Sequence, residues 1–68
     1  MIYFFSKDEH YTRCEIHPGR PHVLTVVDPT GQERVERYIS DTDLRDRWAE
    51  VTTELVAGGW SGPFGRGR

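Results

Sequence analysis

The sequence has little of the chemistry that supports secreted or membrane proteins. Cys14 is the only cysteine among the 68 residues, so no disulfide can form within the chain. A secreted domain of this size normally needs several disulfides. The apolar run 1–5 is short and lacks a basic leader, so we expect no signal peptide, and nothing approaches the roughly 20 apolar residues of a membrane span. We expect a cytoplasmic protein without membrane contact.

A strong excess of positive charge is also lacking. The formal net charge is −2, so the chain as a whole does not indicate binding to nucleic acid. Its 35% hydrophobic and 29% charged residues are typical of a folded domain. A chain of this length buries only roughly 60% of its unfolded surface, so self-association would be a useful further source of burial.

Local patterns predict four strands and the turns between them. The segment 11–17 alternates, with Cys14 and Ile16 on its inward face, whereas 22–27 is apolar on both faces and predicts a central strand. In the last strand, the pattern places Val35 and Ile39 on the inward face. Its register against the preceding strand is open to a shift of one residue. The four predicted strands are residues 2–5, 11–17, 22–27 and 32–39.

Two segments have the composition of turns. The run 18–21 has two prolines and a glycine, which break a strand. The run 28–31 reads Asp-Pro-Thr-Gly, the residues that a type I turn favours, and a bulge at Gly31 would fix the register of the hairpin.

The helix has the strongest local signals. Ser40 is a favourable N-cap, and apolar residues recur afterwards at helical spacing. Gly59 is suited to the left-handed position beyond the helix, which would let Trp60 pack back on the last turn. These features predict a helix over 41–57 whose core face carries Leu44, Trp48, Val51 and Leu55.

The order of elements predicts an α+β fold, a four-stranded antiparallel sheet followed by one C-terminal helix. Residues 1–62 would form the single domain. The segment 63–68 is rich in glycine and contains Pro63, so we expect a flexible C-terminal tail carrying Arg66 and Arg68.

The possible ligands and nucleophiles do not form a recognisable site. Along a strand, Cys14 and His17 would point to opposite faces, and His10 would lie roughly 13 Å from Cys14. No nucleophile elbow, oxyanion motif or phosphate-binding loop is present. We therefore expect no metal, no cofactor and no enzymatic activity.

The sheet face away from the helix is the candidate interaction face. Protein contact, with a second copy or another partner, suits its valines and tyrosines. Its arginines and aromatics would alternatively suit single-stranded nucleic acid. A third possibility is internal cover by Trp60 and Phe64. The predicted face carries Tyr11, Arg13, His17, Val23, Thr25, Val27, Arg34 and Tyr38.

The C-terminal part of the sequence has one recognisable pattern. Residues 59–66 read Gly-Trp-Ser-Gly-Pro-Phe-Gly-Arg and follow a helix containing Arg47 and Trp48. This ending resembles that of a class of short uncharacterised bacterial proteins and implies no activity. The predicted element order is also similar to one repeat of the PUR and Whirly single-strand-binding folds, an analogy that concerns element order alone.

Overall fold

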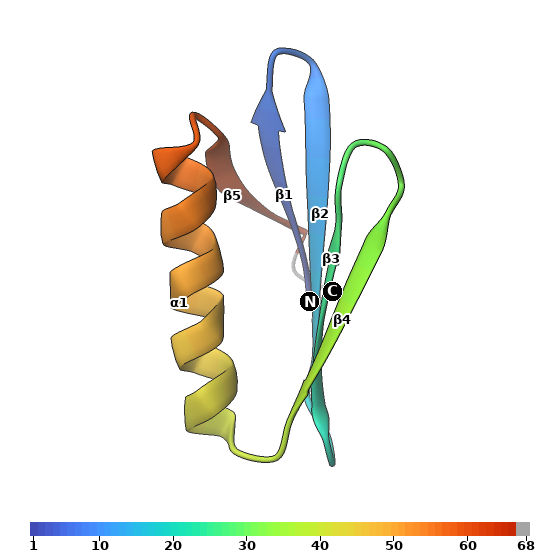
Figure 1. Cartoon of the computed structure of the whole chain (residues 1–68). Coiled ribbons are helices and arrows are strands. Elements are labelled where there is room, and N and C mark those ends of the chain that lie inside the picture. The colour runs from blue at the N-terminus through green and yellow to red at the C-terminus, as the bar shows by residue number, and fades with distance from the viewer. Residues whose placement is uncertain (67–68) are drawn as a thin grey trace.

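The computed structural model describes residues 1–66 as one antiparallel sheet of five strands with a helix on one face (Figure 1). The α+β class is confirmed, but a fifth strand follows the helix. The sheet order is β4-β3-β2-β1-β5, so the last strand pairs with the first. The elements are β1 Ile2–Lys7, β2 His10–His17, β3 His22–Val27, β4 Glu33–Tyr38, α1 Asp41–Ala57 and β5 Ser61–Arg66.

The hairpin between β3 and β4 has the predicted turn. The N–H of Gly31 donates to the carbonyl of Asp28 at 2.9 Å, and the N–H of Asp28 donates to the carbonyl of Gln32 at 3.0 Å. Gly31 has φ +90°, which a glycine adopts without strain. These are the bonds of a type I turn closed by a glycine bulge. They set the register in which Val27 lies opposite Glu33.

Helix α1 begins and ends where the sequence predicted. The Ser40 hydroxyl accepts a bond from the N–H of Asp43 at 3.3 Å. At the other end, Gly59 has φ +93°, and the N–H of Trp60 donates to the carbonyl of Leu55 at 3.0 Å. This is a Schellman ending, so the next residues turn back toward the sheet. The Lys7 ammonium donates to the carbonyl of Gly58 at 2.6 Å, giving the negative helix end a cation from β1.

The segment after the helix corrects the predicted tail. Residues 63–66 belong to β5, which runs antiparallel to β1 with Phe64 opposite Phe4. Gly67 and Arg68, the rest of that expected tail, lie outside the described residues. A side chain at Gly62 would place its Cβ 2.8 Å from the Phe5 ring, and φ there is +144°. A glycine therefore allows β5 to pass against Phe5.

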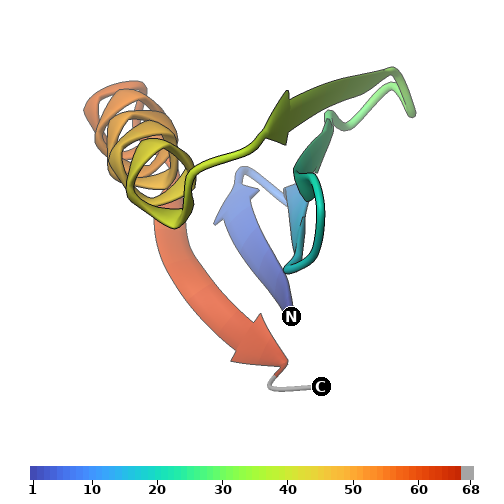
Figure 2. The ribbon, with the colours of Figure 1, turned by 90° about the horizontal axis from the view of Figure 1, so that it is seen from below.

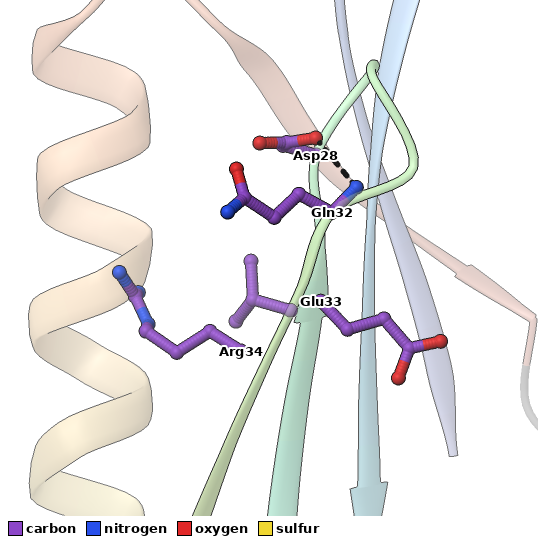
Figure 3. A pocket seen from close by; sticks show the side chains of 5 residues that line it. Asp28, Gln32, Glu33 and Arg34 are labelled. Carbon is purple, nitrogen blue, oxygen red and sulfur yellow. Dashed lines mark hydrogen bonds between the residues drawn. The ribbon is translucent and has the colours of Figure 1, made fainter.

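Strand β4 has the opposite orientation to the one predicted. Its register with β3 places Arg34 beside Val26 and Glu36 beside Leu24, on the side of the helix. Figure 3 shows Arg34 pointing toward α1 and Glu33 pointing away. The expected inward residues, Val35 and Ile39, are 41% and 87% exposed.

An ion pair with the helix stabilises this orientation, which follows from the register that the turn sets. The Arg47 guanidinium donates to both carboxylate oxygens of Glu36, at 2.9 and 3.3 Å, and the Tyr38 hydroxyl donates to the same carboxylate at 2.6 Å. These hydrogen bonds hold the pKa of Glu36 below its ordinary value, with the Arg47 contact the largest cause. A polar network thus connects β4 to α1 where an apolar contact was expected.

The core lies entirely between the sheet and the helix. Trp48 packs against it, with ring centroids 5.1 Å from Tyr3 and 6.1 Å from Phe5, but is only partly buried. Trp48 thus lies on the core face of the helix, as predicted, although its side chain keeps some exposure. Trp60 also packs on this side. The buried apolar residues are Phe5, Cys14, Leu24, Leu44 and Val51.

Candidate interaction face

The sheet face that turns away from α1 has no element packed on it within residues 1–66, as Figure 2 shows. We call it the open face. Residues directly opposite one another on neighbouring strands share a face, so the registers identify its members. They are Ile2, Phe4, Ser6, Tyr11, Arg13, Glu15, His17, Val23, Thr25, Val27, Glu33, Val35, Arg37 and Phe64.

An apolar groove lies at one end of the open face. Its walls are aromatic: Tyr11 is 62% exposed, Phe64 is 55% exposed, and Phe4 lies between their strands and is partly buried. Ser6 and Gly65 complete the lining. Large aromatic side chains are normally buried on folding, so three of them around a solvent-facing groove mark a surface suited to binding.

Four of the six predicted site residues lie on this face. Tyr11 and Arg13 on β2 share the open face with Val23 and Val27 on β3, and Val27 lies directly opposite Arg13. Arg34 and Tyr38 are not among them, because the inverted orientation of β4 turns both toward the helix. On β4 the open face instead carries Glu33, Val35 and Arg37, so Arg37 takes the place that was predicted for Arg34.

Phe4 and Phe64 were missed as members of the site. The sequence indicated Phe64 only as a possible cover for the face and Phe4 only as part of the first predicted strand. The pairing of β1 with β5 places the two rings opposite each other. The signal that could have located them is the alternation of residues 61–66, in which an aromatic residue stands among small ones.

The charges on β2 largely compensate one another. The Arg13 guanidinium lies 2.8 Å from the Glu15 carboxylate, and His17 Nε2 lies 3.0 Å from its other oxygen. The hydrogen bond from His17 is the largest cause that lowers the pKa of Glu15, followed by the positive charge and hydrogen bond of Arg13. These contacts of Glu15 leave little net charge along the middle of the open face.

A second hollow lies beside the β3–β4 turn on the helix side (Figure 3). Its polar groups are already engaged. The Asp28 carboxylate accepts from the backbone N–H groups of Thr30 and Gln32 at 2.9 and 3.0 Å, and the Thr30 hydroxyl is the largest cause that lowers the pKa of Asp28. Arg34 lies 3.2 Å from Glu36. These groups stabilise the turn and the strand, so the hollow is a weaker candidate than the groove.

Cys14 lies under the helix and is fully buried. Burial raises the pKa of its thiol to about 11, against a smaller opposing effect of Arg34. A thiolate is the reactive form, so this environment suppresses nucleophilic chemistry.

Two other kinds of feature are absent from the described part of the chain, a metal-binding cluster and a membrane-spanning helix. Residues 1–66 contain no group of three or more His, Cys, Asp or Glu side chains placed to hold a metal ion. No helix in that part of the chain has both the length and the apolar character needed to cross a membrane. Comparison with known proteins finds no matching family, no matching curated protein and no matching solved structure. Function must therefore be argued from the surface itself.

Proposed function

We propose that the protein is a binding module that associates with another protein surface through its open face, and that it is not an enzyme. The exposed aromatic groove of Phe4, Tyr11 and Phe64 carries this proposal. Aromatic side chains are enriched at protein interfaces because they bury a large area with few rotatable bonds. The matching surface would insert an apolar side chain between Tyr11 and Phe64.

The size of the face is consistent with this role. The molecule measures 36 × 22 × 20 Å along its principal axes, and a stable interface buries roughly 800 Å² on each partner. The open face is broad enough to supply most of that area. The partner is a second copy of the chain or a different protein. In either case it would present an apolar side chain to the groove.

Single-stranded nucleic acid is the second candidate. Three aromatic rings on a sheet face could stack on bases, as in other sheet-based binders of single strands. Phosphate contacts, however, need unpaired cations, and Arg13 is already neutralised by Glu15. Arg34 faces the helix, and the positive charges of Arg13 and Arg37 on the open face are balanced by those of Glu15 and Glu33 on the same face. The charge distribution therefore supports protein contact over nucleic-acid contact.

Peptide selection tests the proposal directly. A random peptide library would be selected on the wild-type protein and on Phe64→Asp, with Thr53→Asp on the exposed outer side of α1 as the matched control. We expect peptides with aromatic or aliphatic anchors to be enriched by the wild type and by Thr53→Asp but not by Phe64→Asp. Equal enrichment by all three proteins would contradict a role for the groove.

Amide-shift titrations separate the two kinds of ligand. Shifts at the groove amides of Phe4, Tyr11 and Phe64 during dilution, away from β4, would identify a second copy as the partner of the groove. A mixed single-stranded oligonucleotide should cause little change. Binding that is lost in Tyr11→Ala and falls steeply with salt would instead establish nucleic acid as the ligand, because phosphate contacts release counterions.

A further inference from the structure

Strand β4 forms one edge of the sheet and pairs only with β3 (Figures 1 and 2). An edge strand presents unpaired backbone groups that can pair with another strand. The other edge, β5, contains Pro63 and two glycines, which weaken pairing. By contrast, β4 has neither proline nor glycine along its six residues.

The turn determines which backbone groups of β4 face outward. The N–H of Asp28 donates to the carbonyl of Gln32, so Gln32 directs its backbone toward β3. Hydrogen-bonded and non-bonded pairs alternate along an antiparallel ladder. Every second residue after Gln32 is therefore bonded to β3, while the N–H and C=O groups of Glu33, Val35 and Arg37 point to the free edge.

The side chains of β4 are complementary to a second copy of themselves. The strand reads Glu-Arg-Val-Glu-Arg over residues 33–37. When two copies of the strand are aligned antiparallel with Val35 opposite Val35, Glu33 of each copy lies opposite Arg37 of the other. Arg34 of each copy likewise lies opposite Glu36 of the other. Opposite charges directly across two strands stabilise the pairing, and like charges oppose it.

We propose that two copies of the chain pair antiparallel through β4, about a two-fold axis at Val35, and join their sheets into one. Backbone phase allows this register, because it places the outward groups of Val35 against those of the second copy, and charge selects it from the others that backbone phase allows. A slip of one residue in either strand direction would move side chains to the wrong face. The neighbouring registers that keep the faces aligned set Arg34 against Arg34 or Glu36 against Glu36.

The ion pairs within one copy are compatible with this contact. Among the side chains that the structure describes, Glu33 and Arg37 take part in no ion pair, so both are available to the second copy. The Arg34 side chain is 57% exposed and could reach Glu36 of the second copy. Charged residues on an edge strand often prevent aggregation, because side chains of one charge sign repel those of a second copy. In β4 the two signs alternate, so the strand attracts its own copy. The contact uses the edge of the sheet and does not depend on ligand binding at the open face.

Charge reversal provides the first test. Sedimentation equilibrium would be measured for the wild type, Glu33→Arg, Arg37→Glu and the double variant. Protein concentrations would reach about 1 mM, because edge pairing buries a small area and is expected to be weak. Each single variant places like charges in both symmetry-related contacts and should raise the dimer Kd at least about tenfold, whereas the double variant restores opposite charges and should regain wild-type affinity. A wild type that stays monomeric, or a double variant as weak as the single ones, would overturn the proposal.

A backbone substitution distinguishes the edge from the open face. Val35→Pro removes an outward N–H but no bond to β3, so the monomer should keep its circular dichroism spectrum while the dimer is lost. Tyr11→Asp lies on the open face away from the edge and should leave the dimer intact. If Tyr11→Asp dissociates the dimer and Val35→Pro does not, self-association occurs through the open face and the edge contact is wrong. Should Val35→Pro unfold the monomer, the charge reversals alone decide.

Discussion

The hairpin between β1 and β2 contains the strained residues of the backbone. Asp8 and Glu9 have φ of +50° and +67°, the left-handed values that a two-residue turn of this kind requires. A residue with a side chain is disfavoured there by roughly 1–2 kcal/mol, and asparagine or aspartate tolerates the position better than glutamate. The strain therefore falls mainly on Glu9.

Replacing Glu9 with glycine should stabilise the protein. Glu9→Gly removes the steric conflict at Cβ, and after the extra backbone entropy of glycine we expect a net gain of about 0.5–1 kcal/mol in the free energy of unfolding. Urea denaturation would measure it. Glu9→Ala removes the charge but keeps Cβ, so it should gain nothing. An equal gain from both variants would mean that charge, and not strain, matters at this position.

Cys14 should react only when the protein opens. Its thiol is fully buried, and with a pKa of about 11 very little thiolate is present at pH 8. We expect labelling by a thiol reagent to be slow in buffer and fast in denaturant, with a rate in buffer that follows the opening of the helix from the sheet. Rapid labelling of the folded protein would contradict the burial of Cys14.

At the scale of elements, β5 depends on a close contact at Gly62. Gly62→Ala would bring a Cβ within 2.8 Å of the Phe5 ring and 2.9 Å of the Phe4 carbonyl. The strained backbone and the overlap should together cost at least about 2–3 kcal/mol. Gly65→Ala is the matched control in the same strand, since its Cβ would lie at an ordinary 3.6 Å from Tyr3. Thermal unfolding of both variants would test the difference, and similar melting temperatures would argue against the contact.

The Glu36–Arg47 pair should make stability depend on pH. The folded-state pKa of Glu36 is lowered, so its contribution is fully present above the unfolded value of roughly 4.3 and is lost as the pH falls through the lower folded value. Glu36→Gln should therefore be less stable than the wild type at pH 7, by about 1 kcal/mol. The two proteins should converge in acid.

The matched control for this prediction is Asp46→Asn. Asp46 is exposed on α1 and has no ion pair among the described residues, yet its substitution changes the net charge equally. Its effect at pH 7 should be small. A constant difference between Glu36→Gln and the wild type down to pH 2 would show that the carboxylate charge is not the cause.

The sequence predicted those elements whose signals are local. The limits of α1 were predicted correctly because the Ser40 cap, the apolar spacing and Gly59 all act within a few residues of one another. The β3–β4 turn was also predicted correctly because Asp28 and Gly31 define it alone. Strand β5 was missed because its partner, β1, lies at the other end of the chain, and glycine and proline hid its extended pattern.

The predicted face failed where a polar contact replaced an apolar one. Val35 has the character of a core residue, so β4 was oriented by its apolar side chains. In the structure the register set by the bulged turn orients the strand the other way. The pairing of Glu36 with Arg47 stabilises that orientation, and it depends on the distance between two elements that the sequence does not give. Tyr11, Arg13, Val23 and Val27 were placed correctly because β2 alternates clearly and β3 was treated as apolar on both sides.

For the whole molecule, stability rests on one thin core. Trp48 bridges the helix to Tyr3 and Phe5, so Trp48→Ala should cost about 3 kcal/mol, a large share of the stability of so small a domain. Val56→Ala, at a position 51% exposed on the same helix, should cost far less. Chemical denaturation would compare them. A Trp48→Ala variant that melts within a few degrees of the wild type would place the main core elsewhere.

The pairing of the first strand with the last has a mechanical consequence. Ile2 lies opposite Arg66, so both ends of the described chain leave the domain at the same end of the β1–β5 ladder. A force that pulls the two ends apart would load the bonds of this ladder one after another rather than all at once. Under tension the domain would peel open from β5 at low force, while the strands from β1 to β4 remained paired.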